Sequence, residues 1–207
     1  MAGDTRPAAP HRHVAVQEAD FDLGAEVAAL REGDMGIGAV ASFVGTVREW
    51  RGVPHMPADH GKPYTEAPTG PSLVLEHYPG MTERTIEAMV DEAIRRFELR
   101  GARVIHRVGP LALGDQIVLV CVSAPHRRAA FEGCEFLMDW LKTQAPFWKK
   151  EVSAQGSEWV DAREQDDAAL ARWGEVPDAV ANMAQAGSTA SMAAPDPRHQ
   201  AAKEQGA

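Results

Sequence analysis

The sequence predicts an α+β protein with a mainly antiparallel sheet. Three observations support this class: apolar runs rich in β-branched residues, two segments with apolar residues at helical spacing, and strands that follow one another in pairs. A Rossmann-type fold would instead alternate single strands with helices and carry a glycine-rich phosphate loop. The chain contains no GxGxxG or P-loop motif and no internal repeat.

The expected elements follow the order α, β, β, α, β, β, α, β, β. Asp22 is a good cap for the first helix, which carries Leu23, Val27 and Leu30 and stops near Gly33. The segment PLALGD is expected to form a turn, because it combines proline with a Gly-Asp pair. The other expected elements are strands 37–47 and 72–78, helix 81–97, strands 102–109 and 116–124, helix 129–142 and a hairpin of strands 149–154 and 157–162.

The two longer helices are strongly amphipathic. In helix 81–97 we expect Thr82 to be the N-cap with Glu83 behind it, and Gly101 to follow as a stop. Arg95 and Arg96 suit the C-terminal end of its dipole. Its apolar stripe is Ile86, Met89, Val90, Ala93, Ile94 and Phe97, and that of helix 129–142 is Ala130, Phe131, Cys134, Leu137, Met138 and Leu141. Pro146 disfavours the α conformation at Ala145, so the latter helix should end near Thr143.

The chain is expected to form one domain, 12–174, between tails 1–11 and 175–207 that are predicted to be disordered. The Pro- and Gly-rich stretch 51–71 is expected to be a mobile loop between two strands. Apolar residues make up 44% of the sequence, which is enough for a sizeable core.

Composition excludes several classes of function. The net charge of −9 argues against a protein that binds nucleic acid over its whole surface. No stretch reaches the roughly 18 apolar residues of a membrane span, and the N-terminus shows no apolar signal segment. Cys121 and Cys134 have no CxxC spacing and are expected to be buried free thiols. These features favour a cytoplasmic protein.

Three basic segments lie at the ends of expected elements. Arg48 follows a buried strand, His126 and Arg127 open a helix, and LKTQAPFWKKE places Lys142 before a turn and two more lysines after it. Cations at a helix N-terminus oppose the dipole unless an anion binds there, so the pattern favours an anion site. A structural interpretation is also open: Lys142 suits the C-terminal end of a helix, and neighbours in a strand point to opposite faces.

The histidines show no metal-ligand spacing, so no metal site is expected. His77 and His106 are expected to be packed strand residues. Phe147 and Trp148 either pack the turn into the core or line a channel for a partner.

Five segments together resemble the large, catalytic subunit of molybdopterin synthase. They are FVGTVRE, LEHYPGMTE, VIHRVGPLALGD, APHRRAAFEG and DWLKTQAPFWKKE, in this order, and the similarity spans residues 14–173. The resemblance implies an α/β hammerhead-type fold and a homodimer that binds two copies of a small ubiquitin-like sulfur carrier, a heterotetramer. The carrier's C-terminal Gly-Gly thiocarboxylate would supply sulfur to cyclic pyranopterin monophosphate, which makes the dithiolene of molybdopterin without a cofactor or metal.

The resemblance also implies which residues act. Lys142 and Lys149 match the catalytic lysines, and we expect Lys142 to transfer protons while Lys149 stabilises charge. The histidine and arginine at the helix start would reach the pocket of the other subunit. The implied substrate-binding residues are Thr46, Val47, Arg48, His126, Arg127, Lys142, Lys149, Lys150 and Glu151. The chain ends EQGA rather than Gly-Gly, so the carrier is expected to be a separate protein.

Two other functions compete with sulfur transfer. A non-catalytic dimeric module could use the same residues to bind an anionic ligand or a ubiquitin-like partner. A lysine enzyme could form a Schiff base with a carbonyl substrate. Loss of Lys142 would leave binding intact in the first, and borohydride would trap an adduct without a sulfur donor in the second.

Overall fold

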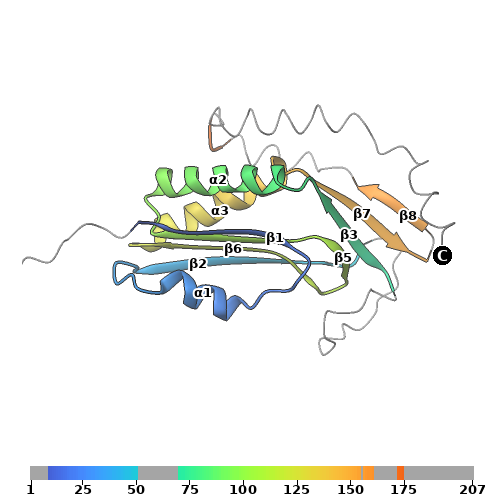
Figure 1. Ribbon diagram of the computed structural model, residues 1–207, viewed down its shortest axis with the longest axis horizontal. Helices are drawn as coiled ribbons and strands as arrows, with labels where there is room; N and C mark the ends of the chain where they lie inside the picture. Colours follow the sequence, from blue (N-terminus) through green and yellow to red (C-terminus); the bar gives the residue numbers. More distant parts are fainter. Residues whose placement is uncertain (1–8, 51–69, 155, 161–171, 175–207) are drawn as a thin grey trace, which may run out of the picture.

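The computed structural model describes residues 9–50, 70–154, 156–160 and 172–174. These residues form two four-stranded sheets and three helices (Figure 1). The order along the chain is β1 His11–Gln17, α1 Leu23–Arg31, β2 Ala39–Thr46, β3 Ser72–His77, α2 Met81–Phe97, β4 Gly101–Arg107, β5 Gly109–Ala112, β6 Gln116–Ala124, α3 Arg127–Thr143, β7 Phe147–Ser153 and β8 Gly156–Val160.

The larger sheet has the strand order β1-β4-β6-β2, and the smaller has the order β5-β3-β7-β8. Only the β1–β4 pair is parallel among the described strands. The predicted α+β class with a mainly antiparallel sheet is therefore confirmed. Helices α2 and α3 cover one face of the larger sheet and α1 covers the other, while the smaller sheet extends from its end (Figure 1).

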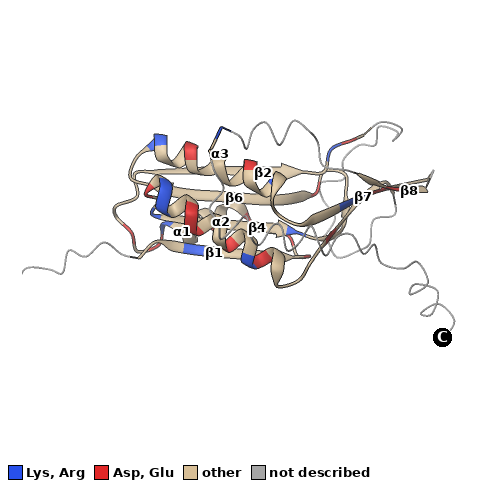
Figure 2. Cartoon of the chain, turned by 90° about the horizontal axis from the view of Figure 1, so that it is seen from above, with Lys and Arg blue, Asp and Glu red and all other residues tan. Residues whose placement is uncertain are grey.

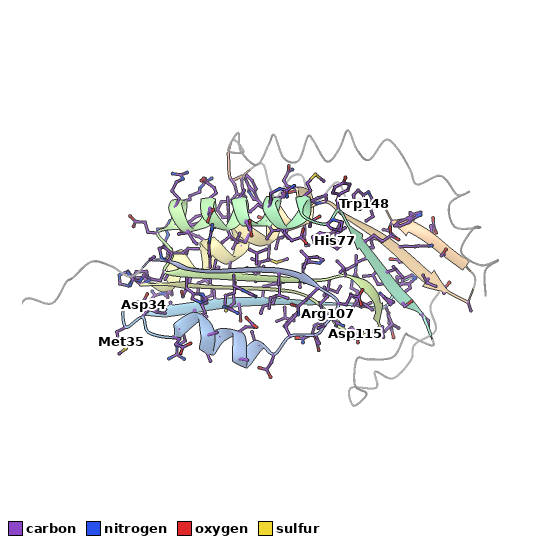
Figure 3. All side chains as sticks on the ribbon, in the orientation of Figure 1. Asp34, Met35, His77, Arg107, Asp115 and Trp148 are labelled. Atoms are coloured by element: carbon purple, nitrogen blue, oxygen red, sulfur yellow. The ribbon has the colours of Figure 1, made fainter. Side chains whose placement is uncertain are left out.

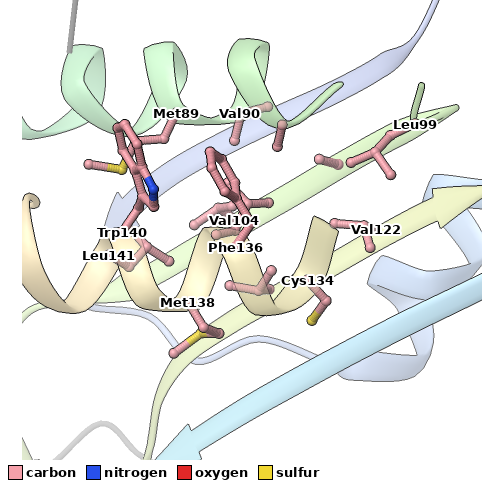
Figure 4. Close-up of a cluster of buried hydrophobic side chains, with 14 of the residues drawn as sticks. Met89, Val90, Leu99, Val104, Val122, Cys134, Phe136, Met138, Trp140 and Leu141 are labelled. Carbon is pink, nitrogen blue, oxygen red and sulfur yellow. The ribbon is translucent and has the colours of Figure 1, made fainter. Parts of the chain in front are cut away.

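Most of the core lies between α2, α3 and the larger sheet (Figure 4). Strand β6 supplies alternate side chains to both faces: Val120 and Val122 contact this core, and Leu119 and Cys121 contact a second one under α1. Burial on both faces explains why β6 is a continuous apolar run. Figure 4 labels the α3 side chains Cys134, Phe136, Met138, Trp140 and Leu141 in the main core.

Several local predictions are confirmed. Helix α2 has the predicted bounds, and Arg95 and Arg96 occupy its last turn. The Asp22 side chain accepts a hydrogen bond of 2.7 Å from the Ala25 N–H, as expected of the cap of α1. Helix α3 ends at Thr143.

Three predictions about the expected elements are wrong. Strand β1 precedes the first helix although no strand was expected there, because its polar residues leave no clear apolar alternation and it is held by pairing with β4. The first three residues of the predicted turn PLALGD, 110–112, belong to β5 because they pair with β3, and the turn itself is confined to Leu113 and Gly114. Phe131 is 65% exposed and lies off the buried face of α3.

The prediction that Thr82 caps α2 is also wrong. Gly80 occupies the N-cap position with a φ of 78°, and its N–H donates a hydrogen bond of 2.6 Å to Glu83 Oε2. A positive φ at this position favours glycine over any residue with a Cβ. Thr82 is fully buried inside the first turn of the helix.

The predicted tails and the predicted loop 51–71 fall mostly on residues 1–8, 51–69 and 175–207, which lie outside the described residues. His11, at the end of the first predicted tail, belongs to β1. Within the described chain, no helix has the length and apolarity that a bilayer crossing requires.

Candidate active site

The two candidate catalytic lysines lie on either side of one short connection. Lys142 is in the last turn of α3, and Lys149 is the third residue of β7. Because α3 packs on the larger sheet and β7 belongs to the smaller one, this connection leads from one part of the fold to the other between the two lysines (Figure 1).

Strand geometry separates the roles of Lys149 and Lys150. Lys149 Nζ lies 3.2 Å from Glu151 Oε1, with the two side chains 38% and 22% exposed. Lys150 points to the opposite face, where its Nζ lies 5.5 Å from the centroid of the Trp159 ring on β8. The prediction that the two lysines face opposite ways is confirmed.

A backbone hydrogen bond and a ring-stacking contact hold the connection between α3 and β7. The Phe147 N–H donates a hydrogen bond of 2.9 Å to the Ala145 carbonyl, which turns the chain around Pro146. The Phe147 ring stacks on His106 of β4, with ring centroids 3.7 Å apart and planes inclined by 16°. The expectation that the aromatic pair packs the turn into the core is thus confirmed for Phe147.

Trp148 occupies the next position of β7, opposite Glu76 of β3. Figure 3 labels Trp148 and His77 where β3 and β7 meet the start of α2; they occupy neighbouring register positions, so their side chains project to opposite faces of the sheet. His77 Nε2 lies 3.6 Å from Glu83 Oε1, so the packed role expected of His77 includes this contact with the first turn of α2.

Thr46, Val47 and Arg48 stand at the end of β2. Val47 is buried, its N–H donates a hydrogen bond of 2.8 Å to the Asp115 carbonyl, and its own carbonyl accepts one of 2.8 Å from the Gly114 N–H. These two bonds hold the backbone immediately before Arg48, whose side chain is exposed.

His126 and Arg127 lie at the far end of α3 from Lys142. A helix of 17 residues is about 25 Å long, so the two groups cannot converge within one chain. Both residues are exposed, and the first turn of α3 contains no acidic residue. Figure 2 shows the corresponding separation of basic segments, one group in β7 and another at the opposite end of the helices.

The neighbouring Arg128 forms an ion pair within α3. Its Nε donates a hydrogen bond of 2.9 Å to Glu132 Oε1 one turn along α3. The start of α3 therefore combines the positive end of the helix dipole with the cationic group of Arg127, an arrangement that attracts anions.

The two cysteines are buried free thiols, as predicted. Burial raises the pKa of Cys121 to about 11 and that of Cys134 to about 12. Both therefore stay protonated near neutral pH and are poor nucleophiles. In the part of the chain that the structure describes, no three His, Cys, Asp or Glu side chains gather as metal ligands would.

Sequence reasoning did not single out Thr82 as a contact of this site. The Thr82 hydroxyl accepts a hydrogen bond of 3.2 Å from the Tyr78 N–H and donates one of 3.3 Å to the Pro146 carbonyl. His106 was expected only to be packed, but it contacts the same turn through Phe147. Neither contact leaves a signal in the sequence, since the partners are far apart along the chain.

Comparisons with known proteins agree with the resemblance in the five segments. The family model described as MoaE protein matches residues 16–144. The molybdopterin synthase catalytic subunit of Ralstonia nicotianae is 56% identical over 176 residues, which cover 84% of this chain and 92% of that protein. The subunit of the same name from Vibrio cholerae is 47% identical and covers 79% of this chain and 98% of that protein.

A solved structure supports the same assignment. The molybdopterin biosynthesis MoaE protein from Burkholderia ambifaria aligns with a TM-score of 0.63 and 49% sequence identity, and covers 80% of this chain and 99% of that chain. The region matched by the family model contains β2, β4 and β6 of the larger sheet, all three helices and the candidate residues up to Lys142. The chain therefore belongs to the MoaE protein family, whose relatives include the molybdopterin synthase catalytic subunits.

Proposed function

We propose that this chain is the catalytic subunit of a molybdopterin synthase. It transfers sulfur from the thiocarboxylated C-terminus of a small ubiquitin-like carrier to cyclic pyranopterin monophosphate, which forms the dithiolene of molybdopterin. The observation that carries the proposal is the placement of Lys142 and Lys149 on either side of one bonded turn, in a chain whose relatives have this activity by name. We also propose a cytoplasmic location, in keeping with the two unpaired thiols.

The reaction needs groups that move protons and stabilise negative charge. The thiocarboxylate sulfur forms a bond to a substrate carbon and displaces a phosphate oxygen from it, which opens the cyclic phosphate. Water then hydrolyses the acyl–sulfur bond, which leaves the sulfur on the substrate and a carboxylate on the carrier. Lys142 transfers protons in these steps. Lys149, held 3.2 Å from Glu151 by their shared face of β7, stabilises the developing charge. Buried Cys121 and Cys134 take no part, because the sulfur arrives on the carrier.

The phosphate is bound by cations from two chains. Arg48 comes from the same subunit as the lysines, and His126 and Arg127 come from the second copy in a homodimer. The length of α3 supports this division, since it separates Lys142 from Arg127 by about 22 Å along the helix axis in one chain. Thr46, Val47, Lys150 and Glu151 complete the proposed substrate contacts, and one carrier on each subunit makes a heterotetramer.

A conversion assay tests the proposed reaction. Purified protein is mixed with thiocarboxylated carrier and cyclic pyranopterin monophosphate, and molybdopterin is followed as its oxidised fluorescent derivative. We expect product from the wild type, none from Lys142→Ala, and normal product from Arg128→Ala, a control cation that pairs with Glu132. No product from a folded wild-type dimer that binds the carrier would favour the non-catalytic binding module.

Mixing two inactive variants tests the shared site. In a dimer of Lys142→Ala with Arg127→Ala, one of the two sites keeps both wild-type residues, and the other loses both. Equal amounts exchanged at random should therefore recover about a quarter of the wild-type activity. Activity no greater than that of the separate variants would show that both residues act within one chain.

A further inference from the structure

The short connection between α3 and β7 decides where the two lysines stand relative to each other. The packing of α3 fixes the position of Lys142, whereas the pairing of β7 with β3 fixes the position of Lys149. One lysine is on a helix of the larger sheet and the other is on a strand of the smaller sheet. The distance between their side chains therefore depends on how the residues between them are held. Contacts from two other elements hold these residues.

The first contact comes from α2. Thr82 is fully buried, and its hydroxyl donates a hydrogen bond of 3.3 Å to the Pro146 carbonyl. The same oxygen accepts a hydrogen bond of 3.2 Å from the Tyr78 N–H, so the hydroxyl proton is directed to the turn. A helix residue whose hydroxyl bonds outside its own helix links the start of α2 to the turn between the lysines.

The second contact comes from β4. His106 stacks nearly parallel on Phe147, and its Nδ1–H donates a hydrogen bond of 2.9 Å to the Arg107 carbonyl. A carbonyl oxygen only accepts, so this bond fixes the tautomer and the plane of the imidazole ring. The fixed imidazole ring therefore restricts the position of Phe147, which is the first residue of β7 and directly follows Pro146.

We propose that Thr82 and His106 are positioning residues for the sulfur-transfer reaction: together they hold Pro146 and Phe147, and so set the separation of Lys142 from Lys149. The inference rests on the proposed function of the lysines. Neither residue touches substrate in this proposal. A displacement of about 1 Å in a reacting group can lower a rate by about a hundredfold, so a turn held at two neighbouring residues matters for turnover.

Substitutions at two buried threonines of α2 isolate this role. Thr82→Val removes the hydroxyl with little change in shape, and Thr82→Ser restores it. Thr85→Val is the matched control, because Thr85 is equally buried but donates its hydrogen bond of 2.9 Å to the Met81 carbonyl inside the helix. We expect kcat to fall by about tenfold or more in Thr82→Val, with a smaller change in KM, and to stay near the wild-type value in Thr82→Ser and Thr85→Val.

Equal kcat values for Thr82→Val and Thr85→Val would overturn the proposal, and so would a failure of Thr82→Ser to restore turnover. Amide hydrogen exchange supplies a readout that does not depend on activity. The peptide containing residues 143–149 should exchange faster in Thr82→Val than in the wild type and Thr85→Val. If the wild type makes no product, the proposed function fails, while unchanged exchange in Thr82→Val separately refutes the positioning role.

Discussion

Acidification should destabilise this protein through His106. Burial and, to a smaller extent, the nearby His77 lower the pKa of this side chain to about 4, although the hydrogen bond to the Arg107 carbonyl partly opposes the shift. In the folded chain the imidazole is therefore neutral down to about pH 4, whereas in the unfolded chain it takes up a proton near its ordinary pKa of 6.5. Between these values the unfolded state binds more protons, so the free energy of unfolding falls as the pH falls.

The size of the effect follows from the two pKa values. The difference between 6.5 and about 4 corresponds to about 3 kcal/mol when the pH is below both values. At pH 5 His106 is almost fully protonated in the unfolded chain and mostly neutral in the folded chain. About 2 kcal/mol of the free energy of unfolding should then be lost relative to pH 7.

Urea unfolding of the wild type and of His106→Phe, each at pH 7 and pH 5, measures this loss. Phenylalanine keeps a ring to stack on Phe147 but cannot take up a proton. Other groups, including His13, whose pKa is also lowered by burial, titrate in both proteins and cancel in the comparison. The wild type should lose about 2 kcal/mol more than the variant. Equal losses in the two proteins would refute the reasoning, and dilute protein is needed because the sequence pI is about 5.3.

Two further predictions concern the buried cysteines and the partly buried Trp173, all away from the lysines. Cys121→Ala and Cys134→Ala should each lower the free energy of unfolding by about 1 kcal/mol yet leave molybdopterin formation unchanged, and a folded cysteine variant without sulfur transfer would contradict the proposed chemistry. Trp173→Ala should cost about 2 kcal/mol, because the ring packs edge-on against Phe97 and Phe136 and donates a hydrogen bond of 2.7 Å to Asp139. Trp159→Ala is the control for urea unfolding: Trp159 is 50% exposed, and an equal cost there would show that the Trp173 contacts contribute little.

Helix positions could be predicted well, because the signals that define helices are local. The apolar stripe of α2 repeats along its own segment, and the residues that end α3 lie next to its last turn. The strands were harder to predict. β1 and β5 carry little alternation of their own and exist because β4 and β3 supply their hydrogen-bonding partners.

Tertiary packing also determined whether individual side chains are buried and which groups they contact. Phe131 fits the spacing of the α3 stripe but is exposed, because the buried face of α3 is turned toward Gly133, Phe136 and Trp140. Thr82 stands close enough to the start of α2 to be expected as its cap, yet its hydroxyl bonds to the turn before β7. In both cases the partner that decides the outcome comes from a distant part of the chain.

By itself, the sequence determined the α+β class, the two long helices, the buried thiols and the basic residues on which the proposed chemistry depends. These are properties of residue type and local spacing, which the printed chain contains in full. Only the tertiary structure decided that Thr82 and His106 contact the turn between Lys142 and Lys149, and that α3 keeps Arg127 about 22 Å away from Lys142. The physical reason is that such contacts depend on the relative placement of separate elements, which long-range packing and strand pairing determine.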